Sequence, residues 1–347
     1  MFKHKEEKRM KITKILVALS FLFAVSTAQA GEMTVTGSMQ ATYQSEPDKT
    51  TGNPLGMDRE IKFAGSTELD NGMNMSVMQD FGDDGSFGDA KITFGNVGGL
   101  VDIYVGTDGS ELDAIDDITP SAFEEANGSG SGTYQDIGTF VQEMGIGAKF
   151  SLPIIGTVRG QYIPKVDSSE NADKVASGSL GMKGSGQELV VKTALGDVPF
   201  IGDFLGGNTL TVGYAEEEMA TVANTTDAFE ITAALTGSIG NFSYGYQVEH
   251  IDLGQTVALT DAIFYRVDSI GLAYAVNDAL SISYNMMEQK QHNVAADSSF
   301  EQETDAINIG YTVGGLTIGF QDASTDNANM VKAATDDTRT ISIKAAF

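Results

Sequence analysis

The chain lacks cysteine and tryptophan and holds few basic residues. With no cysteine among 347 residues, a disulfide framework, a thiolate zinc site and a cysteine nucleophile are excluded. Only 21 Lys and Arg stand against 48 Asp and Glu, which gives a formal charge of -27. Because surfaces that bind nucleic acid replace counterions with Lys and Arg, this balance argues against nucleic acid as a partner.

The first thirty residues have the three parts of a secretory signal. A basic stretch from Lys3 to Lys14 precedes an apolar run from Ile15 to Val25, and small residues then end at Ala30. The apolar run is shorter than the ~20 residues that a membrane-spanning helix needs. We therefore expect a signal peptide over 1–30 and a single domain over 31–347.

The remaining chain repeats with a period of two residues. From Met33 to Tyr43, apolar or small residues occupy the odd positions, and hydroxyl or amide residues occupy the even positions. Successive side chains of a strand point to opposite faces, so each such segment has one apolar face and one polar face. Counting every alternating run gives about 17, whereas closed barrels of this type have an even number of strands. Removing the glycine-rich run from Ala176 to Lys183 leaves 16, and one missed strand would make 18.

The connections between these runs alternate in length. Tight turns such as Asp70-Asn71-Gly72 and Gly314-Gly315 are interleaved with long acidic connections. Short turns at one end and long loops at the other are typical of an all-β, antiparallel, up-and-down transmembrane barrel. The long connections are expected at Ser45 to Asp58, Thr107 to Gly138, Pro164 to Lys174, Glu249 to Asp261, Glu288 to Glu303 and Asp322 to Asp337.

One connection does not fit either class. When strands are counted from the start of the chain, the connection from Leu195 to Asn208 falls at the outer end of the barrel. When they are counted back from the end of the chain, it falls at the inner end. Its apolar piece from Val198 to Leu205 is interpreted as a buried or subunit-contacting connection.

Several features together resemble the general diffusion porins of Gram-negative outer membranes, and in particular their alphaproteobacterial branch. They are the signal, the strands Ile92-Thr93-Phe94-Gly95 and Val101 to Gly106, the long acidic connection after the fifth strand, and a terminal Phe347 on an alternating strand. The terminal Phe of this chain resembles the residue that forms part of the recognition signal for barrel insertion in that family. The resemblance implies a multi-pass barrel in the outer membrane of a Gram-negative bacterium, in contact with its lipid and assembled as a homotrimer.

The same resemblance implies that the loop after the fifth strand folds into the barrel and narrows it. The matching segment 107–138 contains no Lys or Arg, and if it does not fold inward it is an external acidic stretch. Strand parity places four basic residues on the wet face, where they would meet the carboxylates of this loop: Lys62, Lys91, Lys149 and Arg159. The expected constriction carboxylates are Asp108, Glu111, Asp113, Asp116, Asp117, Glu124 and Glu125.

The sequence thus predicts a channel for passive diffusion of small hydrophilic solutes and ions, with a preference for cations. The alternative is a non-conducting barrel whose acidic external loops bind a partner or calcium. Asp83 and Asp84 offer clustered oxygen ligands for a low-affinity calcium site, although no EF-hand pattern is present, and we expect no resident cofactor. A catalytic role finds no support, because the sequence contains no zinc-site histidine pair and no nucleophile elbow.

Overall fold

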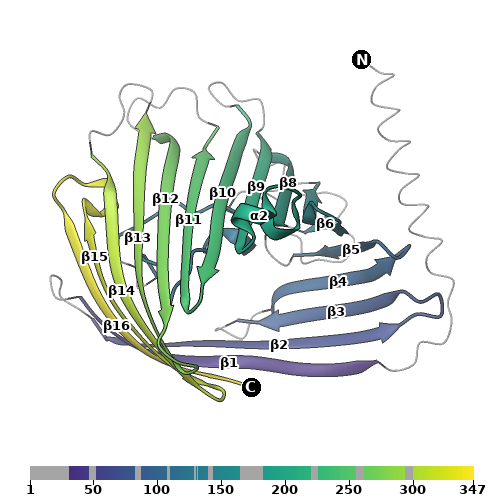
Figure 1. Ribbon diagram of the computed structural model, residues 1–347, viewed down its shortest axis with the longest axis horizontal. Coiled ribbons are helices and arrows are strands. Elements are labelled where there is room, and N and C mark those ends of the chain that lie inside the picture. Colours follow the sequence, from purple (N-terminus) through teal and green to yellow (C-terminus); the bar gives the residue numbers. More distant parts are fainter. Residues whose placement is uncertain are drawn as a thin grey trace.

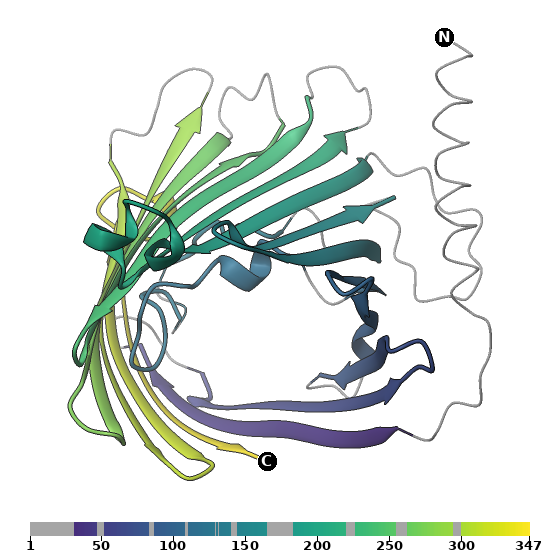
Figure 2. The same ribbon diagram turned by 45° about the vertical axis from the view of Figure 1, so that its right-hand side comes forward.

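The computed structural model describes residues 31–46, 52–82, 87–107, 110–128, 130, 132–139, 144–164, 183–219, 226–254, 262–293 and 300–347. Within them, sixteen antiparallel strands close into one barrel (Figures 1 and 2). The expectation of 16 strands is confirmed, and the alternative of 18 is wrong. The signal peptide expected over 1–30 lies outside the described residues.

Neighbours in sequence are neighbours in the sheet throughout, as in an up-and-down barrel. The strands are β1 Glu32–Ser45, β2 Leu55–Glu68, β3 Asn74–Phe81, β4 Phe87–Val97, β5 Val101–Gly106, β6 Gly145–Leu152, β7 Gly156–Ile163, β8 Lys183–Ala194, β9 Asn208–Met219, β10 Ala228–Ile239, β11 Phe242–Asp252, β12 Ala262–Ala275, β13 Leu280–Asn293, β14 Gln302–Val313, β15 Leu316–Asp326 and β16 Thr335–Ala346. The helical turns are η2 Asp113–Ile115, η3 Leu195–Asp197, α2 Gly202–Leu205 and η4 Ala328–Met330. None of the helices in the described part of the chain is long and apolar enough to cross a membrane.

The barrel closes where β1 pairs with β16. Just beyond β16, the backbone of Phe347 exchanges two hydrogen bonds with Gly37, each with an N–O distance of 3.0 Å. A side chain at position 37 would be too close to its neighbours, because a Cβ there would lie 2.9 Å from the Phe347 ring. The Phe347 side chain stands on the outer surface with 68% of its area exposed. Its predicted role in barrel insertion stays a prediction.

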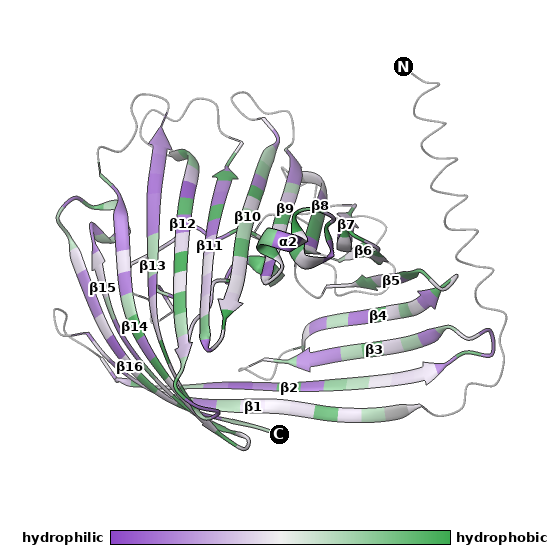
Figure 3. Ribbon diagram, viewed as in Figure 1, coloured by the Kyte–Doolittle hydropathy of each residue, from purple (hydrophilic) through white to green (hydrophobic). Residues whose placement is uncertain are grey.

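Hydrophilic and hydrophobic residues alternate along many strands, as the period of two predicts (Figure 3). Val35, Ile61 and Ile341 lie exposed on the outer surface. Their neighbours Thr36 and Lys62 pair in register on the inner face. The outer surface is therefore the apolar one, the reverse of a water-soluble protein, in which apolar side chains fill the interior.

The strands reach further into the acidic connections than the sequence predicted. β11 continues to Asp252, β13 to Asn293 and β15 to Asp326, so the loops expected from Glu249, Glu288 and Asp322 begin later. In these stretches the outward residues are polar, which weakens the period-two signal while the backbone hydrogen bonds of the ladder continue. The loop boundaries predicted there are wrong by several residues.

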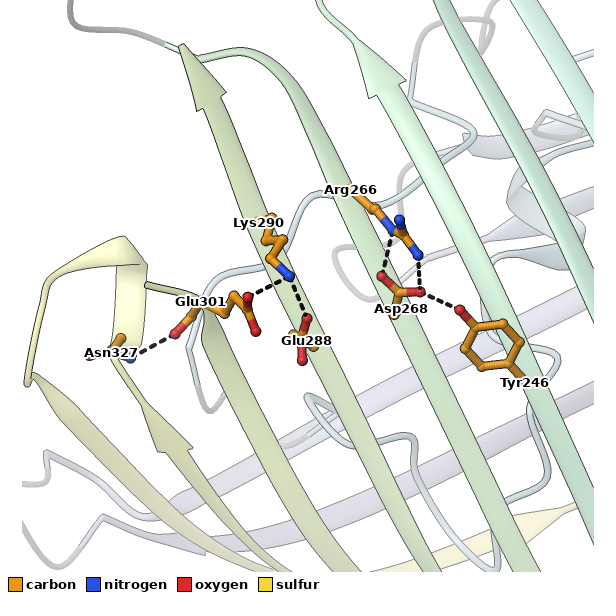
Figure 4. A network of polar contacts seen from close by, with 7 residues as sticks. All are labelled: Tyr246, Arg266, Asp268, Glu288, Lys290, Glu301 and Asn327. Atoms are coloured by element: carbon orange, nitrogen blue, oxygen red, sulfur yellow. Dashed lines mark hydrogen bonds and ion pairs between the residues drawn. The ribbon is translucent and has the colours of Figure 1, made fainter. Parts of the chain in front are cut away.

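Polar contacts tie these strand extensions together on the outer face (Figure 4). Arg266 on β12 holds Asp268 with two nitrogens at 2.7 and 2.9 Å, and Tyr246 of β11 donates to the same carboxylate. Next along the wall, Lys290 of β13 pairs with Glu288 at 3.4 Å and also with Glu301, just before β14. The extended ends of β11 to β14 thus carry a charged, hydrogen-bonded outer surface.

The structure resolves the uncertain region around β8. Lys183, the last residue of the doubtful run, begins β8, and the rest of that run lies outside the described residues. The connection from Leu195 to Gly207 joins β8 to β9 at the end of the barrel that carries the short turns. Burial within the chain is wrong, because Phe200 and Phe204 are each 87% exposed, and contact with another subunit stays a prediction.

Candidate functional site

The connection between β5 and β6 turns back into the barrel (Figure 2). We call residues 110–139 of this connection the inner segment. Its described residues contact inward-facing side chains of β7 to β15, on one side of the enclosed space. Asp108, the first predicted constriction carboxylate, lies outside the described residues.

Two apolar clusters attach the inner segment to the wall. Leu112 is fully buried and Ile137 is 1% exposed, so removing them from water favours the inward position. The first cluster joins Leu112, Ile115 and Ile137 to Ile163, Val190, Ala215 and Ile251 of the wall. The second joins Ala126 and Tyr134 to Val267, Met287, Ala306 and Ala323.

Hydrogen bonds from the wall satisfy the backbone of the inner segment. Gln247 of β11 donates its amide to the carbonyl of Ile115 at 2.8 Å, and Asn285 of β13 donates to Pro120 at 3.0 Å. Further along, Gln302 of β14 donates to the carbonyl of Thr133 at 2.9 Å, and Gln289 accepts from the backbone of Gln135 at 2.7 Å. An irregular segment needs such partners when it leaves water, because each unpaired polar group is costly.

Two buried glutamates of the wall accept hydrogen bonds from the ends of the inner segment. Ser110 donates its hydroxyl to Glu188 of β8 at 2.6 Å. The backbone N–H of Gly138 donates to Glu230 of β10 at 2.7 Å. Both carboxyl groups face inward by strand parity, so parity could have identified them, although the predicted wall residues include only basic ones.

Glycines on the inner wall make room for the inner segment. A Cβ at Gly310 of β14 would lie 2.0 Å from the carbonyl oxygen of Ala122, and one at Gly319 would lie 2.2 Å from the Phe123 ring. Gly310 and Gly319 are direct partners in the ladder between β14 and β15. Gly245 and Gly271 are likewise partners, between β11 and β12, and a Cβ at either would lie 2.5 Å from Pro120. These inward glycines are a signal of close approach that the sequence analysis did not use.

The carboxylates of the inner segment crowd one another. Burial, reinforced by Asp117 and other neighbouring acids, raises the pKa of Asp116 to about 8. Burial and the Asp117 and Asp136 charges raise the pKa of Glu125 to about 7. The pKa values of Asp113, Glu124 and Asp136 are also raised, in each case chiefly by burial. Five of the predicted carboxylates, those of Asp113, Asp116, Asp117, Glu124 and Glu125, thus lie near enough to act on one another or on Asp136, whereas Glu111 contacts Tyr104 and Arg159.

The predicted basic residues all occupy the inner face, and one of them contacts a carboxylate of the inner segment. Arg159 of β7 lies 3.5 Å from Glu111, which also accepts a hydrogen bond from Tyr104. Lys62 pairs instead with Glu60 on its own strand, at 3.4 Å. Lys91 stands 4.9 Å from the Tyr104 ring centroid, and Lys149 is opposite both Asp102 and Arg159 in register.

Lys344 of β16 is a basic residue near the inner segment that was not predicted. Its positive charge lowers the pKa of Glu124, against the larger effect of burial. Asp83 and Asp84, the suggested calcium ligands, lie outside the described residues. Within the described residues, no group of three or more His, Asp or Glu side chains is arranged to hold a metal ion.

No family model and no curated protein matches the chain. Solved structures match it over nearly its whole length. OmpT of Vibrio cholerae in a trimer form has a TM-score of 0.64 at 12% identity, over 92% of this chain and 100% of that one. Salmonella typhi OmpF in complex with daunomycin has a TM-score of 0.62 at 11% identity, over 92% and 98%. An anion-selective porin from Comamonas acidovorans has a TM-score of 0.62 at 13% identity, over 91% and 100%.

At these identities the likeness concerns the fold. What this chain shares with the three proteins is the course of the backbone. The chain therefore has the sixteen-stranded fold of the outer-membrane porins.

Proposed function

We propose that the chain is an outer-membrane channel through which small hydrophilic solutes and ions diffuse passively. Sixteen strands enclose a lumen too wide for wall side chains alone to fill, unlike a barrel of about eight strands. The apolar outer face and the polar inner face support a wall with lipid outside and water inside. The location is the outer membrane of a Gram-negative bacterium, where barrels of this kind occur.

The inner segment narrows this channel. The observation that carries the proposal is its attachment to the wall of β7 to β15 through buried Leu112, Ile115 and Tyr134. Such a fixed segment takes up part of the lumen and leaves the rest open. Asp113 and Asp117 are exposed on its free side. They are the carboxylates that a passing solute would meet.

Charge distribution supports a preference for cations. The carboxylates of the inner segment occupy one side of the lumen, whereas Lys62, Lys91 and Lys149 lie on the inner faces of β2, β4 and β6. A field across the water between them would orient dipolar solutes, and the acidic excess would concentrate cations. No energy source and no chemical step are part of the proposal.

Current through a planar bilayer tests the proposal. Purified protein should give stepwise conductance, and a salt gradient should give a reversal potential of the sign expected for cations. The variant Asp113→Asn/Asp117→Asn should move that potential toward zero, because it removes two exposed negative charges from the lumen. A matched control is Asp197→Asn/Asp203→Asn, which makes the same charge change in the β8–β9 connection and should leave the potential unchanged.

Silence in the bilayer would favour the alternative, a non-conducting barrel whose acidic loops bind a partner. Calcium binding belongs to that alternative, and equilibrium dialysis at millimolar calcium tests it directly. Equal shifts in the charge variant and its control would show that the inner segment does not set ion preference.

We propose a homotrimer as the assembly. The trimer form named for the Vibrio cholerae protein supports it through the shared fold alone. The mass of the detergent-solubilised particle, corrected for bound detergent, should equal three chains, and a mass of one chain would refute the trimer.

A further inference from the structure

The connection between β8 and β9 is unlike the other turns at its end of the barrel. Barrels of this kind have short turns at this end, yet residues 195–207 form two helical turns, η3 and α2, before β9 begins. The turn between β14 and β15, by contrast, is Gly314-Gly315. A longer connection here calls for a role beyond reversing the chain.

This connection is a folded unit with its own hydrogen bonds. The N–H of Gly202 donates to the carbonyl of Val198 at 2.9 Å, and that of Leu205 donates to Ile201 at 2.9 Å. Its glycines pack backbone against backbone, since a Cβ at Gly202 would lie 2.5 Å from the oxygen of Gly196. The fold of the connection therefore fixes which way its side chains point.

Those side chains are apolar and uncovered. Phe200 and Phe204 are 87% exposed, and Ile201 and Leu205 are 45% and 41% exposed. Phe200 also has a φ of 68°, a left-handed conformation that a bulky residue adopts only at a cost. The connection thus holds an aromatic side chain outward in a strained conformation.

The neighbouring turn between β6 and β7 repeats the pattern. Ile154 has a φ of 72° and is 53% exposed, although a β-branched residue disfavours that conformation. Leu152 and Ile155 beside it are 42% and 47% exposed. We call these three residues and Phe200, Ile201, Phe204 and Leu205 the apolar apron.

Side chains on the outer face of the wall hold both halves of the apron. Thr193 points outward on β8, in register with exposed Leu210, and donates its hydroxyl to the carbonyl of Ile155 at 2.5 Å. Asn208, two residues before Leu210, donates to the carbonyl of Leu205 at 3.2 Å and accepts from Tyr244 at 2.7 Å. The apron therefore continues the apolar outer face of the barrel rather than its polar lumen.

The strands on one side of the apron are short. β5, β6 and β7 have 6, 8 and 8 residues, whereas a tilted strand needs ~9–11 residues to cross a bilayer; β8 and β9 have 12 each. An apolar face that is too short for the hydrocarbon layer leaves a mismatch, which thinning of the lipid or extra apolar surface can relieve. The apron supplies such surface at the ends of β6 and β7, and continues it to the adjoining ends of β8 and β9.

We propose that the apron inserts into the lipid surface that borders the short-turn end of the barrel, at the boundary between headgroups and acyl chains. This inference rests on the proposed membrane location. The residues 152–155 and 195–207 include Asp197 and Asp203 and no Lys or Arg, so apolar contact rather than attraction to headgroup charge drives the insertion. The patch fixes the depth at which the β6 to β9 side sits in the membrane.

The absence of tryptophan from the whole sequence makes a direct test possible. Phe204→Trp introduces one fluorescent probe at the apron, and Asp278→Trp introduces the same probe at an exposed polar turn between β12 and β13. Both full-length variants are reconstituted in phosphatidylcholine vesicles, with bromine atoms placed either high on the acyl chains or near their ends. We expect blue-shifted emission from Phe204→Trp that shallow bromines quench more than deep ones, and little bromine quenching of Asp278→Trp.

Emission from Phe204→Trp that acrylamide quenches and brominated lipid does not would overturn the inference, because the apron would then lie in water. Blue emission quenched by neither reagent would also overturn it, since another protein surface, such as a second copy of this chain, would then cover the apron. Phe200→Trp provides a second probe of the same patch should Phe204→Trp fail to fold. Conductance of the same vesicle preparation distinguishes failure of the channel proposal from failure of the apron proposal. A barrel that does not conduct but whose tryptophan is quenched by brominated lipid would refute the channel and still support insertion of the apron.

Discussion

The outer face of β5 to β8 and the outer face of β12 to β16 differ sharply in charge. Among the described residues, outward positions of β5 to β8 carry no Asp, Glu, Lys or Arg, as Ile103, Phe150 and Val191 illustrate. Outward positions of β12 to β16 carry many charged groups, such as Asp268, Glu288 and Arg339 (Figure 4). The short strands β5 to β7 end where the apolar face ends, whereas the strands of the other side continue as a polar extension.

The inner faces of the two sides differ as well. The wall of β7 to β15 is covered by the inner segment and holds buried Glu188 and Glu230 beneath it. The wall of β2 to β6 carries Lys62, Lys91 and Lys149. One side of the barrel is thus lined by an acidic segment, whereas on the other side the lysines lie among Glu60, Asp80 and Asp102, and the asymmetry follows from where a single connection packs.

Shortening Leu112 should have the largest effect on the lined side. Leu112→Ala removes a fully buried side chain from the first cluster and should weaken the attachment of the inner segment by about 2–5 kcal/mol. Amide hydrogen exchange across 110–139 should rise. Leu100→Ala, at a turn residue that is 74% exposed, is the control and should change little. Equal exchange in the two variants would mean that the cluster does not hold the segment.

A lysine introduced on the outer face should lower the stability of the barrel more on the β5 to β8 side than on the β12 to β16 side. Val191→Lys on β8 places a cation among apolar neighbours, which should cost about 2–4 kcal/mol near the middle of a bilayer. Ser324→Lys on β15 places the same cation beside Asp337, whose carboxylate already accepts a hydrogen bond from Ser324. Unfolding by urea in lipid vesicles measures both variants. Similar losses at both positions would remove the distinction between the two outer faces.

Filling an inward glycine should lift the inner segment off the wall. Gly310→Val puts a side chain where a Cβ already meets the Ala122 carbonyl, and it should cost about 1–3 kcal/mol. Gly95→Val on β4 is the matched change on the other side, where a Cβ would lie 3.4 Å or more from its neighbours. Single-channel conductance should change in Gly310→Val only. A change of the same size in Gly95→Val would show that the effect comes from the strand rather than from the segment.

Titration of carboxyl groups of the inner segment should have a smaller effect on the stability of the folded protein. The pKa of Asp116 is raised to about 8 and that of Glu125 to about 7, chiefly by burial. In the pH range below these values the folded protein binds protons more tightly than the unfolded chain, so stability should fall as pH rises from about 4 to about 8. Thermal unfolding in detergent checks this trend, and Asp116→Asn/Glu125→Gln should flatten it. A slope that persists in that variant would assign the dependence to other groups.

The sequence predicts the wall well and the lumen poorly, for a physical reason. Alternation at Met33 to Tyr43 reports directly on which side of a strand each residue faces, so the two faces of the wall follow from parity. The number of 16 strands, which the structure confirms, needed in addition the rule that such barrels have an even number of strands. The acidic segment 107–138 was located from its length and composition, and the resemblance implied that it folds inward. What parity cannot give is distance across the barrel, so it placed Arg159 correctly on the inner face but could not distinguish its contact with Glu111 from the pairing of Lys62 with Glu60.

The most direct test of the central claim, that solutes pass beside an inner segment fixed within the barrel, uses the absence of native cysteine. Ala114→Cys places one thiol on the exposed side of the segment, between Asp113 and Ile115. A charged thiol reagent is added while current through single channels is recorded. The account predicts a stepwise fall in conductance as each channel is labelled. Complete labelling, verified by mass, with unchanged conductance would contradict it.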